Sequence, residues 1–177
     1  MKTIIIYSSQ TGFTKRYADW IGEELDAEVI TLAEAKKQNA TYFDAAAAII
    51  YGGWAMGGKV VNSEWFTQRI PEWKGRKLVI FCVGASPREL PEVDETIHNM
   101  LTDEEKKYAK AFYCQGGLCY EKMKLPSRLM MKAFASMVRK KKDADERDKK
   151  MAEMLSHSYD IADKKYIEPI VEYVKCE

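Results

Sequence analysis

The sequence predicts an α/β fold in which a doubly wound, five-stranded parallel sheet has the strand order 2-1-3-4-5 and a helical insertion follows the fifth strand. Short apolar runs alternate with amphipathic segments along the 177 residues, as in successive βαβ units. Residues 44–51 are apolar on both faces, which is expected of a central strand covered by helices on both sides. A tight, hydroxyl-rich turn joins the first strand to the first helix. We therefore expect one α/β domain over residues 1–177.

The first strand is predicted over residues 3–7, and an amphipathic helix over residues 15–25. Between them lies the turn Ser8-Ser9-Gln10-Thr11-Gly12-Phe13-Thr14. Its hydroxyl groups and free backbone N–H groups converge at the positive end of the helix dipole, so the turn is a candidate anion site. The turn contains no Lys, which favours a single terminal phosphate over a metal-bound triphosphate. A hydroxyl-rich helix cap that binds no ligand is the alternative.

The remaining elements are inferred from apolar runs and their periodicity. Further strands are predicted over residues 28–32, 44–51, 77–83 and 111–114. Helices are predicted over residues 63–70, 93–101 and 161–174, and residues 33–40 are expected to be helical or irregular. In a sheet wound in this way, the ligand crevice lies beyond the carboxyl ends of the first and third strands, where the winding reverses.

The segment after the third strand is expected to be the second wall of this crevice. It reads Gly52-Gly53-Trp54-Ala55-Met56-Gly57-Gly58-Lys59-Val60. Its four glycines allow the backbone to approach a flat ligand closely, and Trp54 and Met56 add π and polarisable surface. Residues 53–59 also match the G-x-x-x-x-G-K pattern of a nucleotide P-loop, but Val60 stands where the Mg²⁺-binding Ser or Thr belongs. A glycine-rich connector with Trp54 buried in the core is the other alternative.

The first turn resembles the phosphate-binding loop of the flavodoxin superfamily, which holds the phosphate of FMN. The match covers Ser9, Gln10, Thr11, Gly12 and Thr14, while Phe13 departs from the Asn common there. The resemblance implies contacts to the isoalloxazine ring from Gly53, Trp54, Ala55, Met56 and Gly57, and from a second loop at Gly84, Ala85 and Ser86. That loop has no Tyr to stack on the ring, so Tyr120, just after Gly117, is the candidate. FMN is expected rather than FAD, because no G-x-G-x-x-G is present to hold a pyrophosphate.

About forty residues separate the fifth strand from the closing helix, which is too long for an ordinary connection, and we place an insertion at residues 117–157. A predicted helix within it leads into four cations at residues 139–142, and residues 143–150 are expected to be an exposed linker or a disordered loop. One face of this helix carries Leu129, Met130, Ala133, Phe134, Met137 and Val138. In layout the chain is similar to the menaquinone-dependent protoporphyrinogen oxidase family, whose basic helical insertion follows the same strand.

Composition excludes several classes of protein. The 28 Lys and Arg residues nearly balance the 27 Asp and Glu residues, which argues for no nucleic-acid partner, although residues 122–150 hold eleven basic and four acidic residues. The four cysteines form no Cys-x-x-Cys pair and the two histidines add no ligand spacing, so we expect reduced thiols and no metal site. No apolar run has the length of a membrane span and residue 2 leads directly into a strand, so a cytoplasmic protein is expected.

The resemblance implies an FMN-binding redox protein in which FMN carries the electrons, so we name cofactor-contacting residues and no catalytic residue. One form is an electron shuttle that docks on a redox partner protein. The other is a membrane-surface oxidoreductase of the protoporphyrinogen oxidase type, with a quinone acceptor or a tetrapyrrole-like substrate. In that form residues 126–142 dock peripherally on the inner face of the membrane; the alternative is that this helix packs on the body. A flavin-free interaction domain of the same fold is the third hypothesis.

Overall fold

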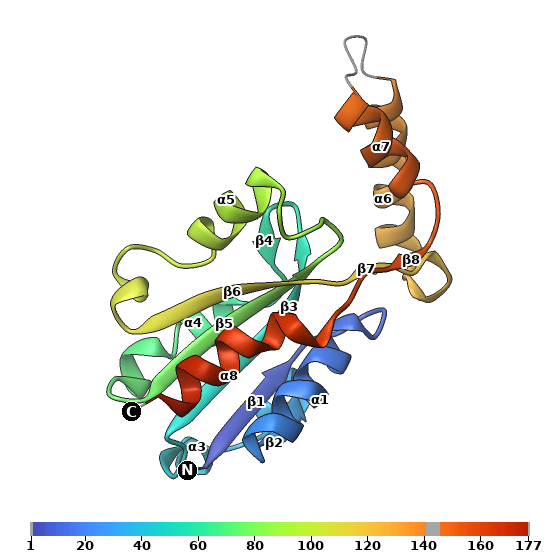
Figure 1. The fold of residues 1–177 in the computed structure, drawn as a ribbon. Helices are drawn as coiled ribbons and strands as arrows, with labels where there is room; N and C mark the ends of the chain where they lie inside the picture. The colour runs from blue at the N-terminus through green and yellow to red at the C-terminus, as the bar shows by residue number, and fades with distance from the viewer. Residues whose placement is uncertain (1, 141–145, 177) are drawn as a thin grey trace.

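The structure is a computed structural model that describes residues 2–140 and 146–176. Its central sheet is parallel and has the order β2-β1-β3-β5-β6, which confirms the predicted order 2-1-3-4-5, since the short strand β4 lies off this path (Figure 1). The strands are β1 (Thr3–Tyr7), β2 (Glu28–Thr31), β3 (Ala48–Met56), β5 (Lys77–Gly84) and β6 (Ala109–Gln115). Tyr7 pairs with both Thr31 and Gly52, so β1, β2 and β3 lie side by side at the carboxyl edge of the sheet.

Helices cover both faces of the sheet. Because neighbouring residues of a strand point to opposite faces, Ile4 and Ile6 join one core cluster and Ile5 joins the other. Each is fully buried, which contributes about 1.5–3 kcal/mol per side chain. The long helix α1 (Phe13–Leu25) and the closing helix α8 (Glu168–Lys175) pack on the Ile5 face. The other face is covered by α2 (Leu32–Ala35), α3 (Thr41–Asp44), α4 (Glu64–Thr67), α5 (Pro91–Asn99) and the 3-10 helix η1 (Ile70–Trp73).

The third strand of the winding differs from its prediction at both ends. β3 begins at Ala48 rather than at residue 44, because Asp44 ends α3 and residues 45–47 connect the helix to the strand. It then continues through the expected loop to Met56 and folds back into β4 (Lys59–Val60), so the second wall is a β-hairpin. Gly57 and Gly58 form its turn with φ of 59° and 76°. Positive φ at both turn positions is the geometry that two-residue hairpins favour, and glycine adopts it without steric cost.

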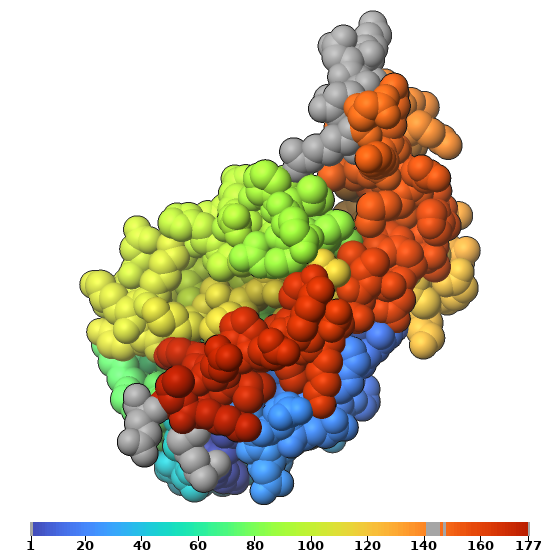
Figure 2. Space-filling model, in the orientation of Figure 1, coloured from blue at the N-terminus to red at the C-terminus, as the bar shows by residue number. Residues whose placement is uncertain are grey.

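The insertion is a helical hairpin that projects beyond the carboxyl edge of the sheet (Figures 1 and 2). Its helices are α6 (Leu125–Arg139) and α7 (Glu146–Met154), and β7 (Gly117–Leu118) pairs with β8 (Tyr159–Asp160) at its base. The expected linker at 143–150 is wrong for residues 146–150, which are helical, and residues 141–145 lie outside the described residues. The apolar residues through which α7 packs come after this tract in the sequence and begin at Met151. The remaining 3-10 helices are η2 (Glu105–Lys107), η3 (Tyr120–Lys122) and η4 (Lys164–Ile167).

Buried tyrosine and cysteine side chains in the sheet make the fold less stable at alkaline pH. Burial raises the pKa of Tyr51 to about 12 and the pKa of Cys82 to about 12. Both groups are neutral in the folded state and ionise at lower pH once unfolded, so their stabilisation is complete below the unfolded pKa values and is lost as pH rises toward 12. Between its pKa value in the unfolded state and its pKa value in the folded state, each group should lower the free energy of unfolding by about 1.4 kcal/mol per pH unit. Denaturant unfolding measured from pH 8 to pH 11 should show this decline, and a constant free energy of unfolding would contradict it.

Candidate functional site

The turn between β1 and α1 has the geometry of an anion site. Gly12 stands at the N-terminal end of this 13-residue helix with φ of 101°, a conformation that other residues rarely adopt. No side chain caps the helix, and its first turn, which the structure describes completely, contains no acidic residue. The backbone N–H groups of that turn therefore remain available, and the helix dipole favours a negative charge beside them. The Ser9 hydroxyl shapes the turn by accepting a hydrogen bond of 3.2 Å from the Gly12 N–H.

The two predicted walls meet at one cavity of about 450 Å³ at the carboxyl edge of the sheet. It is lined by Tyr7, Ser8, Ser9, Gln10, Gly12, Lys15, Thr31, Leu32, Ala33, Trp54 and Asn62. The Ser8 N–H donates to the Gly52 carbonyl at 2.9 Å, which ties the first turn to the hairpin strand. Trp54 is half-buried and faces this cavity, and it is absent from the apolar clusters of the described chain, so its assignment to the core is not supported.

Lys15 and Asn62 are among the residues of this cavity that the sequence analysis missed. Lys15 contributes a positive charge that the turn itself lacks, and its ammonium lies 2.6 Å from the Asp19 carboxylate. The hydrogen bond that Lys15 donates to the Asp19 carboxylate holds the pKa of Lys15 above its usual value, so the charge persists at neutral pH. Asn62 donates to the Ser8 hydroxyl at 3.4 Å from the far side of the hairpin. Lys15 follows the motif by one residue, and this position was the only signal available in the sequence.

The other turn residues occupy different positions. Thr11 is half-buried, and Thr14 is buried in the first helical turn. The Phe13 ring is buried in the core, with the Arg16 guanidinium 5.2 Å from its centre, and it does not line the cavity. The Gln10 amide reaches the insertion instead, where it donates to the Ser127 hydroxyl and accepts from the Lys124 N–H, both at 3.3 Å.

The glycines of β3 have a different role from the one expected. A Cβ on Gly52 would lie 2.1 Å from the Phe81 ring, and one on Gly53 would lie 2.6 Å from Val60. Close packing within the protein therefore leaves no room for a side chain at either position. Ala55 pairs with Val60 in the hairpin and packs on the core, while Met56 and Gly57 are exposed at its tip. Of the five expected ring contacts, Met56 and Gly57 are exposed, Trp54 and Ala55 are half-buried, and Gly53 is buried.

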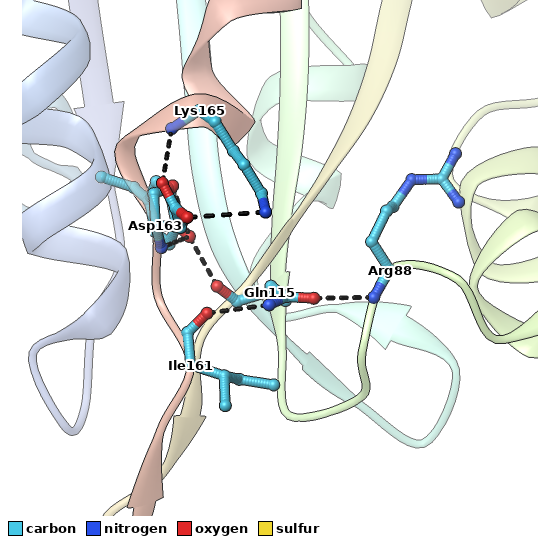
Figure 3. Close-up of polar contacts among 6 residues, drawn as sticks. Arg88, Gln115, Ile161, Asp163 and Lys165 are labelled. Atoms are coloured by element: carbon cyan, nitrogen blue, oxygen red, sulfur yellow. Dashed lines mark hydrogen bonds and ion pairs between the residues drawn. The ribbon is translucent and has the colours of Figure 1, made fainter.

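Hydrogen bonds with side chains of β6 hold the loop that follows β5. Gln115 accepts a hydrogen bond from the Arg88 N–H at 2.8 Å and donates one to the Ile161 carbonyl at 2.9 Å, so a single side chain links this loop to the returning chain (Figure 3). Gly84 leaves room for Tyr113, whose hydroxyl donates to the Ser86 carbonyl at 2.8 Å. The loop at Gly84, Ala85 and Ser86 is thus held by contacts within the protein.

The aromatic residue beside this loop is Tyr159 rather than Tyr120. Tyr120 is buried inside the insertion, where its hydroxyl donates to the Leu155 carbonyl at 2.6 Å, so its ring is not free to stack on a flavin. At Gly117, too, a neighbour within the protein leaves no room for a side chain, because a Cβ there would lie 2.1 Å from the Tyr159 carbonyl oxygen. Tyr159 donates to the Ala85 carbonyl at 2.7 Å. It lies about forty residues from Tyr120 in sequence, beyond a helical hairpin whose path the sequence does not predict.

A second, larger cavity of about 810 Å³ lies between this loop and the helical hairpin. Its lining is mostly apolar and consists of Gly58, Ala85, Ser86, Pro87, Leu90, Glu92, Phe134, Glu146, Lys150, Met151, Met154, Leu155 and Tyr159. The body supplies one wall and α6 and α7 supply the other. Among the described residues no cluster of His, Cys, Asp or Glu could hold a metal ion, and all four cysteines are free thiols.

A doubly wound sheet with an anion site at the reversal of its winding is the arrangement of nucleotide-binding α/β proteins. A Flavodoxin domain model matches residues 4–145, and the chain belongs to this family. A comparison with curated protein sequences gave no significant match.

Similar solved structures include a WrbA-like flavodoxin from Agrobacterium tumefaciens, with 17% identity, 72% of this chain and 87% of that chain covered, and a TM-score of 0.47. A flavodoxin from the domain Archaea has 17% identity, with 99% and 100% of the chains covered and a TM-score of 0.46. A flavoprotein from Lactobacillus acidophilus in complex with FMN has 15% identity, with 64% and 91% covered and a TM-score of 0.45.

Trp54 should report on ligand binding at the first cavity. Bound FMN is expected to quench the fluorescence of Trp54, because aromatic stacking brings the two ring systems into contact. The other tryptophans lie elsewhere: Trp65 and Trp73 pack on the opposite core face, and Trp20 packs on Tyr17. Fluorescence titration of the parent and the Trp54→Phe variant tests this expectation. Equal fractional quenching in the two proteins would mean that another tryptophan is the reporter.

Proposed function

We propose that the protein binds FMN and transfers electrons through it. The observation that carries this proposal is the uncapped first turn of α1, whose free N–H groups face a cavity that also contains Lys15 and Trp54. This donor set fits one terminal phosphate, with Lys15 close enough to balance part of its charge. Trp54 and the hairpin tip offer flat and mobile apolar surface for an attached ring. FMN supplies the redox chemistry when bound, because no side chain of the site needs to donate or accept electrons.

Binding of three flavins tests the proposal. The phosphate socket predicts that FMN binds at least about tenfold more tightly than riboflavin, since each charge-assisted hydrogen bond to phosphate contributes about 1.5–3 kcal/mol. FAD should bind more weakly than FMN, because its phosphate is not terminal. Calorimetric titration of the full chain with each flavin measures these differences. Equal affinity for FMN and riboflavin, or binding of none, would overturn the proposal.

A second candidate function, a small-molecule oxidoreductase, is favoured by the larger cavity. An electron shuttle needs only an exposed cofactor edge, whereas here Phe134, Met151 and Met154 enclose an apolar space beside the Ala85 loop. This space suits a planar, apolar acceptor such as a quinone, or a tetrapyrrole-like substrate. The protoporphyrinogen oxidase-like function stands on this observation together with the basic insertion.

Filling the cavity separates the two functions. In the Met154→Trp variant, a larger side chain occupies the wall of the cavity, so electron transfer to a hydrophobic quinone should slow while transfer to ferricyanide, which reacts at exposed sites, stays unchanged. Stopped-flow reoxidation of the FMN-loaded protein measures both rates. An equal effect on both acceptors, or none on either, favours a shuttle that meets its partner protein outside this cavity.

A further inference from the structure

The exposed large apolar side chains of the described residues are concentrated on one helix. There are six such side chains, and five of them, all except Met56, lie on α6. The exposed fractions are 69% for Leu125, 59% for Leu129, 49% for Met130, 42% for Phe134 and 63% for Met137. We call these five residues the α6 stripe. Soluble surfaces rarely gather large apolar side chains in one patch unless the patch contacts a partner.

The α6 stripe is separate from the side of α6 that packs within the hairpin. α6 already has an inner side, on which Met131, Ala135 and Val138 pack toward Met151 of α7. None of the stripe residues belongs to this packed side, although Phe134 also lines the cavity of about 810 Å³ between the hairpin and the body. The hairpin projects from the body at its base (Figure 1). Packing of this stripe on the sheet's own helices, the alternative weighed from the sequence, is therefore absent from the described structure. α6 is apolar over more of its circumference than packing on α7 requires.

The charges around the stripe indicate what covers it. From residue 122 to residue 140 the chain carries six cations and no carboxylate, and all six cations are exposed. They are Lys122, Lys124, Arg128, Lys132, Arg139 and Lys140. None of the six forms an ion pair within the described residues, although many other Lys and Arg side chains of the chain do. Among the described residues of the two hairpin helices, the acidic side chains are Glu146, Asp148 and Glu153, and all three lie on α7, which packs on the other side of α6. Glu121 lies before α6, in η3.

We infer that α6 docks on an anionic lipid bilayer, with its stripe in the interface and its cations among the headgroups. An amphipathic helix with Leu, Met and Phe on one side and only cations at its margins has the composition of an interfacial helix. No helix among the described residues is long and apolar enough to cross a bilayer, so the contact is peripheral. A second copy of the chain is a poorer occupant, because joining two stripes also brings two sets of unpaired cations together.

Vesicle cosedimentation of the full-length chain tests this inference independently of the flavin. The parent should bind vesicles of phosphatidylcholine and phosphatidylglycerol at low salt, bind less at high salt, and bind pure phosphatidylcholine much more weakly. Each cation near an anionic surface strengthens binding about fivefold, so Arg128→Glu with Lys132→Glu should weaken it about 30-fold or more. The matched reversal Lys36→Glu with Lys37→Glu changes net charge equally on an exposed connection outside the hairpin and should have a much smaller effect.

A second variant separates the apolar contribution. Leu129→Ser with Met137→Ser should reduce binding about tenfold or more, and it leaves the packed side of α6 intact because both side chains are exposed. Unchanged thermal unfolding and FMN affinity confirm that each variant is folded. Absence of vesicle binding at low salt, or equal loss in both charge-reversal variants, overturns the inference. A dimeric parent that becomes monomeric in the Leu129→Ser, Met137→Ser variant overturns it in favour of a second copy.

Discussion

Replacing both Thr11 and Thr14 by alanine is expected to weaken FMN binding by about 2–6 kcal/mol, which is about 30-fold or more in the dissociation constant. The two hydroxyls flank Gly12 in the turn that presents the N–H groups of α1. Loss of each donor leaves a charged phosphate with one hydrogen bond fewer in a site that contains a single nearby cation, Lys15. The effect should therefore exceed that of a threonine on an ordinary surface. Fluorescence titration with FMN measures the dissociation constants of parent and variant.

The control uses the same substitution at two threonines far from the turn. Thr41→Ala with Thr96→Ala alters an exposed residue of α3 and a half-buried residue of α5, and neither lines the cavity. Since Thr14 is 2% exposed, its truncation also leaves a small void, and Thr14→Val keeps the shape while removing the hydroxyl. Weak FMN binding in the Thr14→Val variant assigns the loss to the hydroxyl. An unchanged dissociation constant in the Thr11→Ala, Thr14→Ala variant contradicts the phosphate assignment.

Gly52→Ala should destabilise the fold by about 3 kcal/mol or more, with or without FMN. The added Cβ would lie 2.1–2.7 Å from three atoms of the Phe81 ring. Phe81 is fully buried in the adjacent strand, so its ring has no free space into which to move. A domain of this size should lose about 6–12 °C in Tm for such a change. Differential scanning calorimetry with and without FMN measures it.

A second substitution identifies the clash as the cause. Phe81→Leu removes the ring atoms nearest to position 52, so the Gly52→Ala, Phe81→Leu protein should be more stable than the sum of the two single changes predicts. Gly58→Ala serves as the comparison, because a Cβ there meets nothing within 4 Å and only the positive φ opposes it. If Gly52→Ala keeps its stability and loses only FMN affinity, the glycine serves the ligand and our packing explanation is wrong.

Much of the fold was predictable because the local pattern and the tertiary environment agree. The run Ile4-Ile5-Ile6 is apolar at consecutive positions, which only a strand covered on both faces can accommodate, and the structure buries all three residues. The position of the candidate anion site was predictable for the same reason: the Ser9 to Thr14 turn sits between a strand and a helix, so chain direction alone places its N–H groups at the carboxyl edge. β3 was predicted less well because alanine fits both helix and strand, and residues 45–47 belong to neither.

The sequence by itself determined the sheet order, the phosphate-type turn and the existence of a basic amphipathic insertion, since each depends on neighbouring residues within one element or at one junction. Only the tertiary structure decided which side chains meet there. Tyr159 rather than Tyr120 lies beside the Ala85 loop because a helical hairpin returns the chain to the base of β7. Gly52 and Gly117 prove to have internal neighbours, Phe81 and Tyr159, that leave no room for a side chain at either position. The exposure of the α6 stripe was equally beyond the sequence, because an amphipathic pattern shows that a helix has an apolar side and not whether the rest of the chain covers it.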